Sequence, residues 1–92
     1  MLGRDYIESI LNLAKGKADK INFIPVVWFV SNGDNDLSYH IILCDGENES
    51  YDIADDLADR LVFDKYANSY LVIRDDTYFA TFNAKKILNR NI

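Results

Sequence analysis

The stretch that decides the fold is "PVVWFVSNGDNDLSYHIILC", residues 25–44. Residues 25–30 form a β-branched and aromatic run that is too short for a typical helix, and residues 37–44 read as a second extended segment. Between them, residues 31–36 are a cluster of turn-forming side chains. The stretch therefore predicts a β-hairpin. Pro25 lacks an amide proton, so it belongs at the start of the first strand or on a sheet edge.

Alternate side chains of the second predicted strand point to opposite faces of the sheet. One face would carry Leu37, Tyr39, Ile41 and Leu43, and the other Ser38, His40, Ile42 and Cys44. We expect the first face to contact the core. His40 and Cys44 are the only imidazole and thiol of the chain, and four residues of strand separate their Cα atoms by about 13 Å. That separation excludes a nucleophile and base pair, so we expect His40 to be partly exposed and Cys44 to be a small core side chain.

Helical periodicity appears on both sides of the hairpin. Apolar side chains at intervals of three and four predict a first helix that begins near Asp5, with Gly16 as a candidate for its end. A second helix is expected to begin at a cap on Ser50 or Asp52 and to reach about Phe63.

The C-terminal part repeats the hairpin signal. Residues 70–74 and 78–82 read as strands joined by a tight turn at 75–77, and Asn83 would cap a short basic helix. The predicted order is α-β-β-α-β-β-α, which favours an α+β fold with a small, mostly antiparallel four-stranded sheet and helices on one face. With 92 residues, we expect one compact domain over residues 1–92.

The composition indicates a folded chain. Apolar residues make up 49% of the sequence, which argues against disorder despite the net charge of -5. The longest apolar run, residues 23–30, is far shorter than the roughly 20 residues of a membrane span, and the N-terminus lacks the apolar core of a signal peptide. A single cysteine fits a reducing compartment, so we expect a cytoplasmic protein.

Acidic residues gather in the middle of the chain. Residues 34–76 hold twelve of the fifteen acidic residues and three of the ten basic ones, whereas bases dominate both ends. Such a distribution favours a basic partner near the middle of the chain and disfavours nucleic acid there.

The densest acidic segment is "CDGENESYDIADDLADRL", residues 44–61. As a calcium loop it places Asp45, Glu47 and Glu49 in the first ligand positions. It then has Ser50 where the sharp turn needs glycine, and Asp56 where a longer bidentate glutamate is required. Glycine-rich phosphate loops and zinc ligand sets are also missing from the sequence. We therefore predict no metal, no cofactor and no enzymatic activity.

In the second predicted helix, four aspartates lie within about 100° of one another. They are Asp52, Asp55, Asp56 and Asp59. Like charges three and four residues apart repel, and aspartate is a poor helix former. A solvated helix face and a binding surface for a cationic partner both account for the pattern. The candidate partner-binding residues are Glu47, Glu49, Asp52, Asp55, Asp56 and Asp59.

In size and charge the chain is similar to phage-encoded inhibitors of host defence, including anti-CRISPR proteins, and to immunity proteins that neutralise nuclease toxins. The resemblance implies a nucleic-acid mimic, in which a negatively charged surface covers a basic channel of the partner. We therefore expect a non-enzymatic inhibitor that binds a Lys/Arg-rich protein and neither nucleic acid nor membrane. The alternative is a structural or regulatory subunit that oligomerises, for instance as a homodimer, through a hydrophobic strand edge led by residues 25–30.

Overall fold

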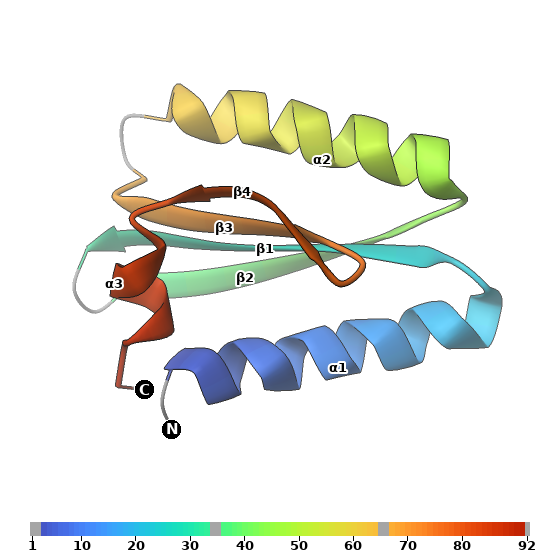
Figure 1. The fold of residues 1–92 in the computed structure, drawn as a ribbon, viewed down its shortest axis with the longest axis horizontal. Helices are drawn as coiled ribbons and strands as arrows, with labels where there is room; N and C mark the ends of the chain where they lie inside the picture. The colour runs from blue at the N-terminus through green and yellow to red at the C-terminus, as the bar shows by residue number, and fades with distance from the viewer. Residues whose placement is uncertain (1–2, 34–35, 65–66, 92) are drawn as a thin grey trace.

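The computed structural model describes residues 3–33, 36–64 and 67–91. Its elements are α1 (Gly3–Ile21), β1 (Ile24–Gly33), β2 (Asp36–Cys44), α2 (Glu47–Val62), β3 (Ser69–Arg74), β4 (Thr77–Phe82) and α3 (Ala84–Leu88). The strands form one antiparallel sheet in the order β2-β1-β3-β4 (Figure 1). The predicted order of elements, the α+β class and the antiparallel four-stranded sheet are confirmed.

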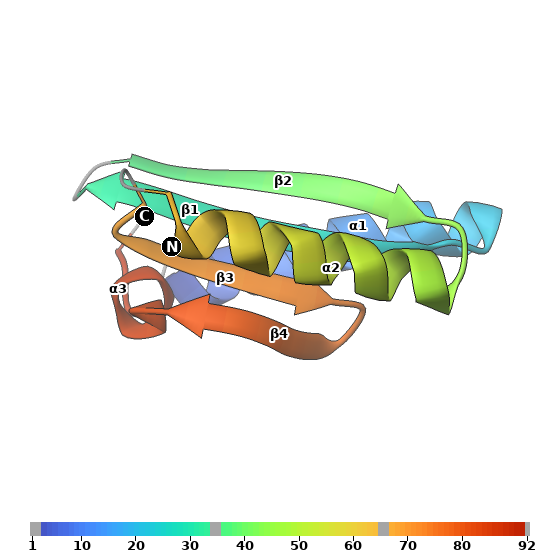
Figure 2. The same cartoon turned by 90° about the horizontal axis from the view of Figure 1, so that it is seen from above.

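Helices cover both faces of the sheet, and the expectation that they would share one face is wrong. Helix α2 lies on one face, and α1 and α3 lie on the other (Figures 1 and 2). The reason is that the central strands are apolar on both faces: in β1, Val26 packs toward α2, whereas Val27 and Phe29 pack toward α1. A strand buried on both faces reads as a continuous apolar run, and each of its faces needs its own cover.

The sheet therefore separates two hydrophobic clusters. The cluster toward α1 and α3 consists of Ile7, Ala14, Val27, Phe29, Leu71, Ile73 and Ile87. The cluster toward α2 consists of Val26, Cys44, Ala54, Leu57, Leu61, Tyr70 and Val72. Alternate residues of β1 and β3 supply both clusters, which makes these two strands the centre of the fold.

The first helix is longer than the sequence suggested. It begins at Gly3, and Gly16 lies in its interior as an exposed residue. Helix α1 ends instead at Asn22, whose φ of 57° is left-handed, and the amide of Phe23 donates to the carbonyl of Ala18 at 2.9 Å. This arrangement satisfies a carbonyl in the last helical turn, so Asn22 has the role that glycine commonly plays at such ends.

The strand order decides which segments are sheet edges. Strand β1 pairs with β2 on one side and with β3 on the other, so residues 25–30 lie in a central strand. The predicted oligomerisation edge led by these residues is therefore not available as an edge. The sheet ends at β2 on one side and at β4 on the other. Within the part of the chain that the structure describes, no helix combines the length and apolarity that crossing a membrane requires.

Candidate partner-binding surface

Helix α2 begins earlier than predicted. Its N-cap is Gly46, with a φ of 101°, so Glu47 and Glu49 lie in the first helical turn instead of in a loop. The Glu49 carboxylate accepts a hydrogen bond from the amide of Asp45 at 2.6 Å. This contact resembles the backward bond of a capping box, and acidic side chains are stabilised at the positive end of the helix dipole. The two glutamates therefore help to begin the helix.

Ser50 is fully buried, and the expectation that it or Asp52 caps the helix is wrong. Its hydroxyl donates to the carbonyl of Glu47 at 2.7 Å and accepts from Nε of Arg74 at 2.8 Å. Nη2 of Arg74 also donates to that carbonyl, at 3.5 Å. The contact ties the end of β3 to the first turn of α2. Sequence reasoning missed it because the partners are 24 residues apart; the available signal was a charged residue directly after the apolar strand residues 70–73.

The four aspartates of α2 are all exposed, on the side opposite the buried Ala54. Rotation of about 100° per residue places Glu49 on the same side of the helix as Asp56, two turns earlier, so the earlier helix start adds Glu49 to this group. We call the resulting set the acidic surface: Glu49, Asp52, Asp55, Asp56 and Asp59. Glu47 is exposed too, but helical rotation puts it opposite Asp56 and on the same side of α2 as the buried Ala54, so it lies outside this set.

The acidic surface is largely uncompensated. Nη2 of Arg60 lies 2.5 Å from Oδ2 of Asp56 in an exposed pair one helical turn apart. Among the described residues, Asp52, Asp55 and Asp59 have no ion-pair partner. Because an exposed pair of this kind contributes only about 0.3–0.5 kcal/mol, Arg60 offsets little of the repulsion.

An exposed aromatic side chain borders the acidic surface. Tyr51 is 53% exposed, and its ring meets that of Phe79 edge to face at a centroid distance of 5.4 Å. Phe79 packs against the hydrophobic cluster between the sheet and α2, so the Tyr51 ring rests on a side chain that is itself packed against the core. At the far end of the helix, Val62 and Phe63 are 63% and 83% exposed. Carboxylates and apolar area therefore occur together along α2.

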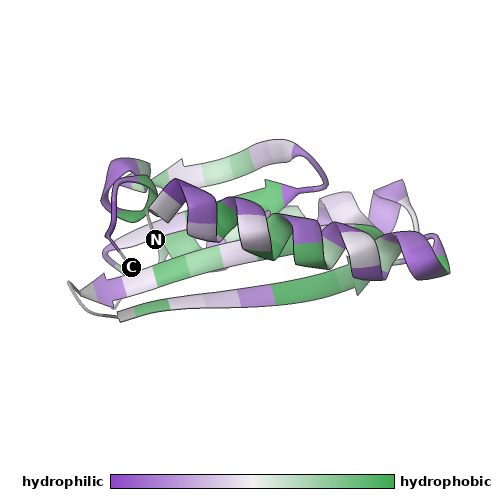
Figure 3. Cartoon of the chain, turned by 90° about the horizontal axis from the view of Figure 1, so that it is seen from below, coloured by the Kyte–Doolittle hydropathy of each residue, from purple (hydrophilic) through white to green (hydrophobic). Residues whose placement is uncertain are grey.

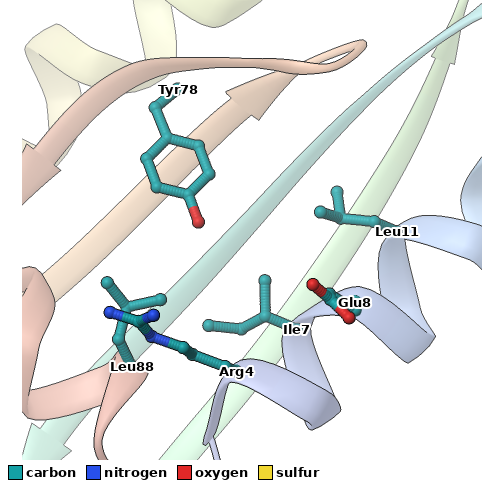
Figure 4. A pocket seen from close by; sticks show the side chains of 6 residues that line it. All are labelled: Arg4, Ile7, Glu8, Leu11, Tyr78 and Leu88. Atoms are coloured by element: carbon teal, nitrogen blue, oxygen red, sulfur yellow. The ribbon is translucent and has the colours of Figure 1, made fainter.

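A pocket of about 370 Å³ lies on the other face, between α1, α3 and β4 (Figure 4). Its apolar lining comes from Ile7, Leu11 and Leu88. The polar groups are those of Arg4, Glu8 and Tyr78, whose hydroxyl points away from β4 toward α1. No hydrogen bond or ion pair joins these three groups in the described structure. The pocket therefore has no assembled acid, base and nucleophile.

His40 and Cys44 are far from forming a catalytic pair. His40 is exposed and stacks on Trp28 at a centroid distance of 4.9 Å. Cys44 is fully buried toward α2. Burial raises the pKa of the Cys44 thiol above its ordinary value of 9.0, and the nearby Glu49 carboxylate raises it further, while Arg74 acts in the opposite direction. The expectations of a partly exposed histidine and a core cysteine are confirmed.

Metal ligands do not converge in the described parts of the chain, where no group of three or more His, Cys, Asp or Glu side chains could hold an ion. Comparison of the chain with protein-family models, with curated proteins and with solved structures finds no match. The chemistry that the described surface offers is the group of exposed carboxylates on one face of α2.

Proposed function

We propose that the protein is a non-enzymatic binding protein that inhibits or neutralises a Lys/Arg-rich protein through the acidic surface of α2. The observation that carries the proposal is the exposure of Asp52, Asp55 and Asp59 on one helix face without a described ion-pair partner. Glu47, also predicted to bind the partner, is exposed at the first turn of α2 but lies outside the acidic surface, so it could contact a partner only at that end of the helix.

The charge pattern lowers the stability of the helix it occupies. Four aspartate pairs lie three or four residues apart, and each costs about 0.2–0.5 kcal/mol. Keeping α2 soluble needs no such repulsion, because alternating signs would hydrate the face equally well. A cationic partner would turn the repulsion into attraction. It would also be drawn to the surface by long-range steering, which accelerates association.

The neighbouring aromatic side chain supports a protein partner over nucleic acid. Tyr51 offers exposed ring area beside the carboxylates, and tyrosine is enriched among the residues that dominate binding energy at protein interfaces. A phosphate backbone would be repelled by the same carboxylates. The surface thus suits a partner that presents Lys and Arg, as the nucleic-acid channel of a defence nuclease or a toxin does.

The test uses a charge-reversed chain with a matched control. Asp52→Lys/Asp55→Lys/Asp59→Lys reverses the acidic surface. The control Asp5→Lys/Glu8→Lys/Asp19→Lys makes the same change in net charge at exposed positions of α1. Both chains are first checked for folding by circular dichroism.

Wild type and both variants are then used to capture partners from the native host, and binding of the identified partner is measured at about 50 and about 500 mM salt. We expect a basic partner whose association rate falls with salt and with the α2 reversal but much less with the α1 control. If the folded α2 variant binds that partner as wild type does, the proposal is refuted.

A further inference from the structure

Strand β4 is an uncharged sheet edge. Its sequence, TYFATF at residues 77–82, contains no charged residue, proline or glycine. Its side chains are exposed at both ends, and Tyr78 and Phe82 are 52% and 50% exposed. Figure 3 shows β4 in pale and green colours beside the purple β3–β4 turn. Edge strands of monomeric proteins are usually protected by charge, proline, a β-bulge or a covering element. Of these devices, the sequence and pairing of β4 show only a bulge, between Tyr78 and Ala80.

We propose that β4 pairs antiparallel with β4 of a second copy of this chain, so that one continuous sheet runs through a two-fold symmetric dimer. The pairing does not rest on the proposed function of α2. The other edge of the sheet, β2, is polar in its middle, where Ser38 and His40 are exposed, and is therefore less suited to the same role.

The opposite charges at the two ends of β4 favour an identical strand as the partner and an antiparallel direction of pairing. The turn before the strand carries Asp75 and Asp76, and the helix after it carries the exposed Lys85 and Lys86. Antiparallel pairing with an identical strand brings the aspartates of each copy to the lysines of the other, at both ends. Parallel pairing would place like charges together at both ends. Asp76 is also paired with Lys15 of its own chain, so Asp75 is the main acidic contributor.

The bulge in β4 fixes the register. Pairing with β3 places Ala80 and Phe82 on the α2 face and Tyr78 on the α1 face, and Phe79 also packs toward α2. Thr77 pairs with Arg74, which reaches α2 as well. Read along the strand, the α2 face carries residues 77, 79, 80 and 82, and the α1 face carries 78 and 81.

This pattern reads the same in both directions. A two-fold axis perpendicular to the sheet therefore places Thr77 opposite Phe82 of the second copy, and Tyr78 opposite Thr81, with each pair on one face. The same axis keeps both α2 helices on one face of the joined sheet. If the proposed function holds, the dimer presents two acidic surfaces side by side to a basic partner, and its avidity exceeds the affinity of one copy.

The dimer is tested by sedimentation velocity on the full chain over a range of concentrations. We expect a species of twice the chain mass of 10.6 kDa that forms as concentration rises. Tyr78→Lys/Thr81→Lys places a lysine of each copy opposite a lysine of the other on the α1 face, and should weaken the dimer more than about tenfold. Tyr78→Glu/Thr81→Glu should do the same. A mixture of the two variants should restore a dimer containing one of each.

Ser38→Lys/His40→Lys adds two lysines to the opposite edge as a matched control and should leave the dimer intact. Should an edge variant fail to fold, Lys85→Glu/Lys86→Glu changes only exposed side chains of α3 and should also weaken the dimer. A wild-type chain that stays monomeric at every concentration overturns the proposal. A dimer that persists in the double-lysine variant of β4, or that is lost in the Ser38→Lys/His40→Lys control, also overturns the proposal.

Discussion

Removing two carboxylates from α2 should stabilise the protein. The change is Asp55→Asn/Asp59→Asn, at two exposed positions of the acidic surface. Each aspartate faces others one helical turn away, so its charge raises the free energy of the folded helix. Asparagine has nearly the same size and helix propensity, and the substitution therefore isolates the effect of charge.

The expected gain follows from the helix positions. The double variant removes three of the four like-charge pairs, namely those of Asp55 with Asp52 and Asp59, and that of Asp59 with Asp56. At about 0.2–0.5 kcal/mol each, they sum to roughly 0.6–1.5 kcal/mol. Asp59 also lies in the last turn, which ends at Val62, where a negative charge opposes the helix dipole by about 0.3 kcal/mol. We expect the free energy of unfolding to rise by about 1–2 kcal/mol at low salt.

Urea denaturation followed by circular dichroism measures the gain, since urea carries no charge and leaves ionic strength free to vary. The gain should shrink between about 10 mM and about 1 M salt, because the screening length falls from about 30 Å to about 3 Å. Asp45→Asn/Asp75→Asn removes the same net charge outside the helices and should not stabilise. A double variant no more stable than wild type at low salt, or a gain unaffected by salt, would refute the electrostatic reasoning.

Three further predictions concern the core and the helix contacts. Gly16→Ala should stabilise the protein by about 0.4–1 kcal/mol, because a Cβ there meets open space. Gly3→Ala should destabilise it by about 1–3 kcal/mol, because the Cβ would overlap the carbonyl oxygen of Ile87. Urea denaturation of the two variants compares the same substitution at two positions of α1. Ser50→Ala should cost about 1–3 kcal/mol in the same assay, because it leaves Nε of Arg74 without its acceptor. The buried Cys44 thiol should react with a thiol reagent only when the protein unfolds. Because the folded pKa of Cys44 is raised above 9.0, the stability that it contributes is present below pH 9 and is lost as pH rises through the raised pKa. Cys44→Ala should remove this fall of the unfolding free energy with pH.

Local patterns were sufficient to predict the elements and their order. The shift from helical to strand periodicity near Pro25 and the turn residues 31–36 are properties of short segments, and the structure has a helix, a hairpin and a second helix there. The ends of the helices differ from those that the local pattern indicated. Gly16 was compatible with a helix end, but the left-handed Asn22 provides one with a bonded carbonyl. Gly46 likewise begins α2 ahead of Ser50.

The exposure of the aspartates on α2 follows from the sequence alone, because a helical period of 3.6 residues separates them from Ala54, Leu57 and Leu61 in any fold that buries those three side chains. The tertiary structure decided the rest. Strand β3 inserts between β1 and β4, which makes residues 25–30 central and leaves β4 at an edge. That order depends on pairing between segments some 40 residues apart, and no local period encodes such pairing. The burial of Ser50 against Arg74 has the same cause, since only the folded sheet brings the end of β3 to the start of α2.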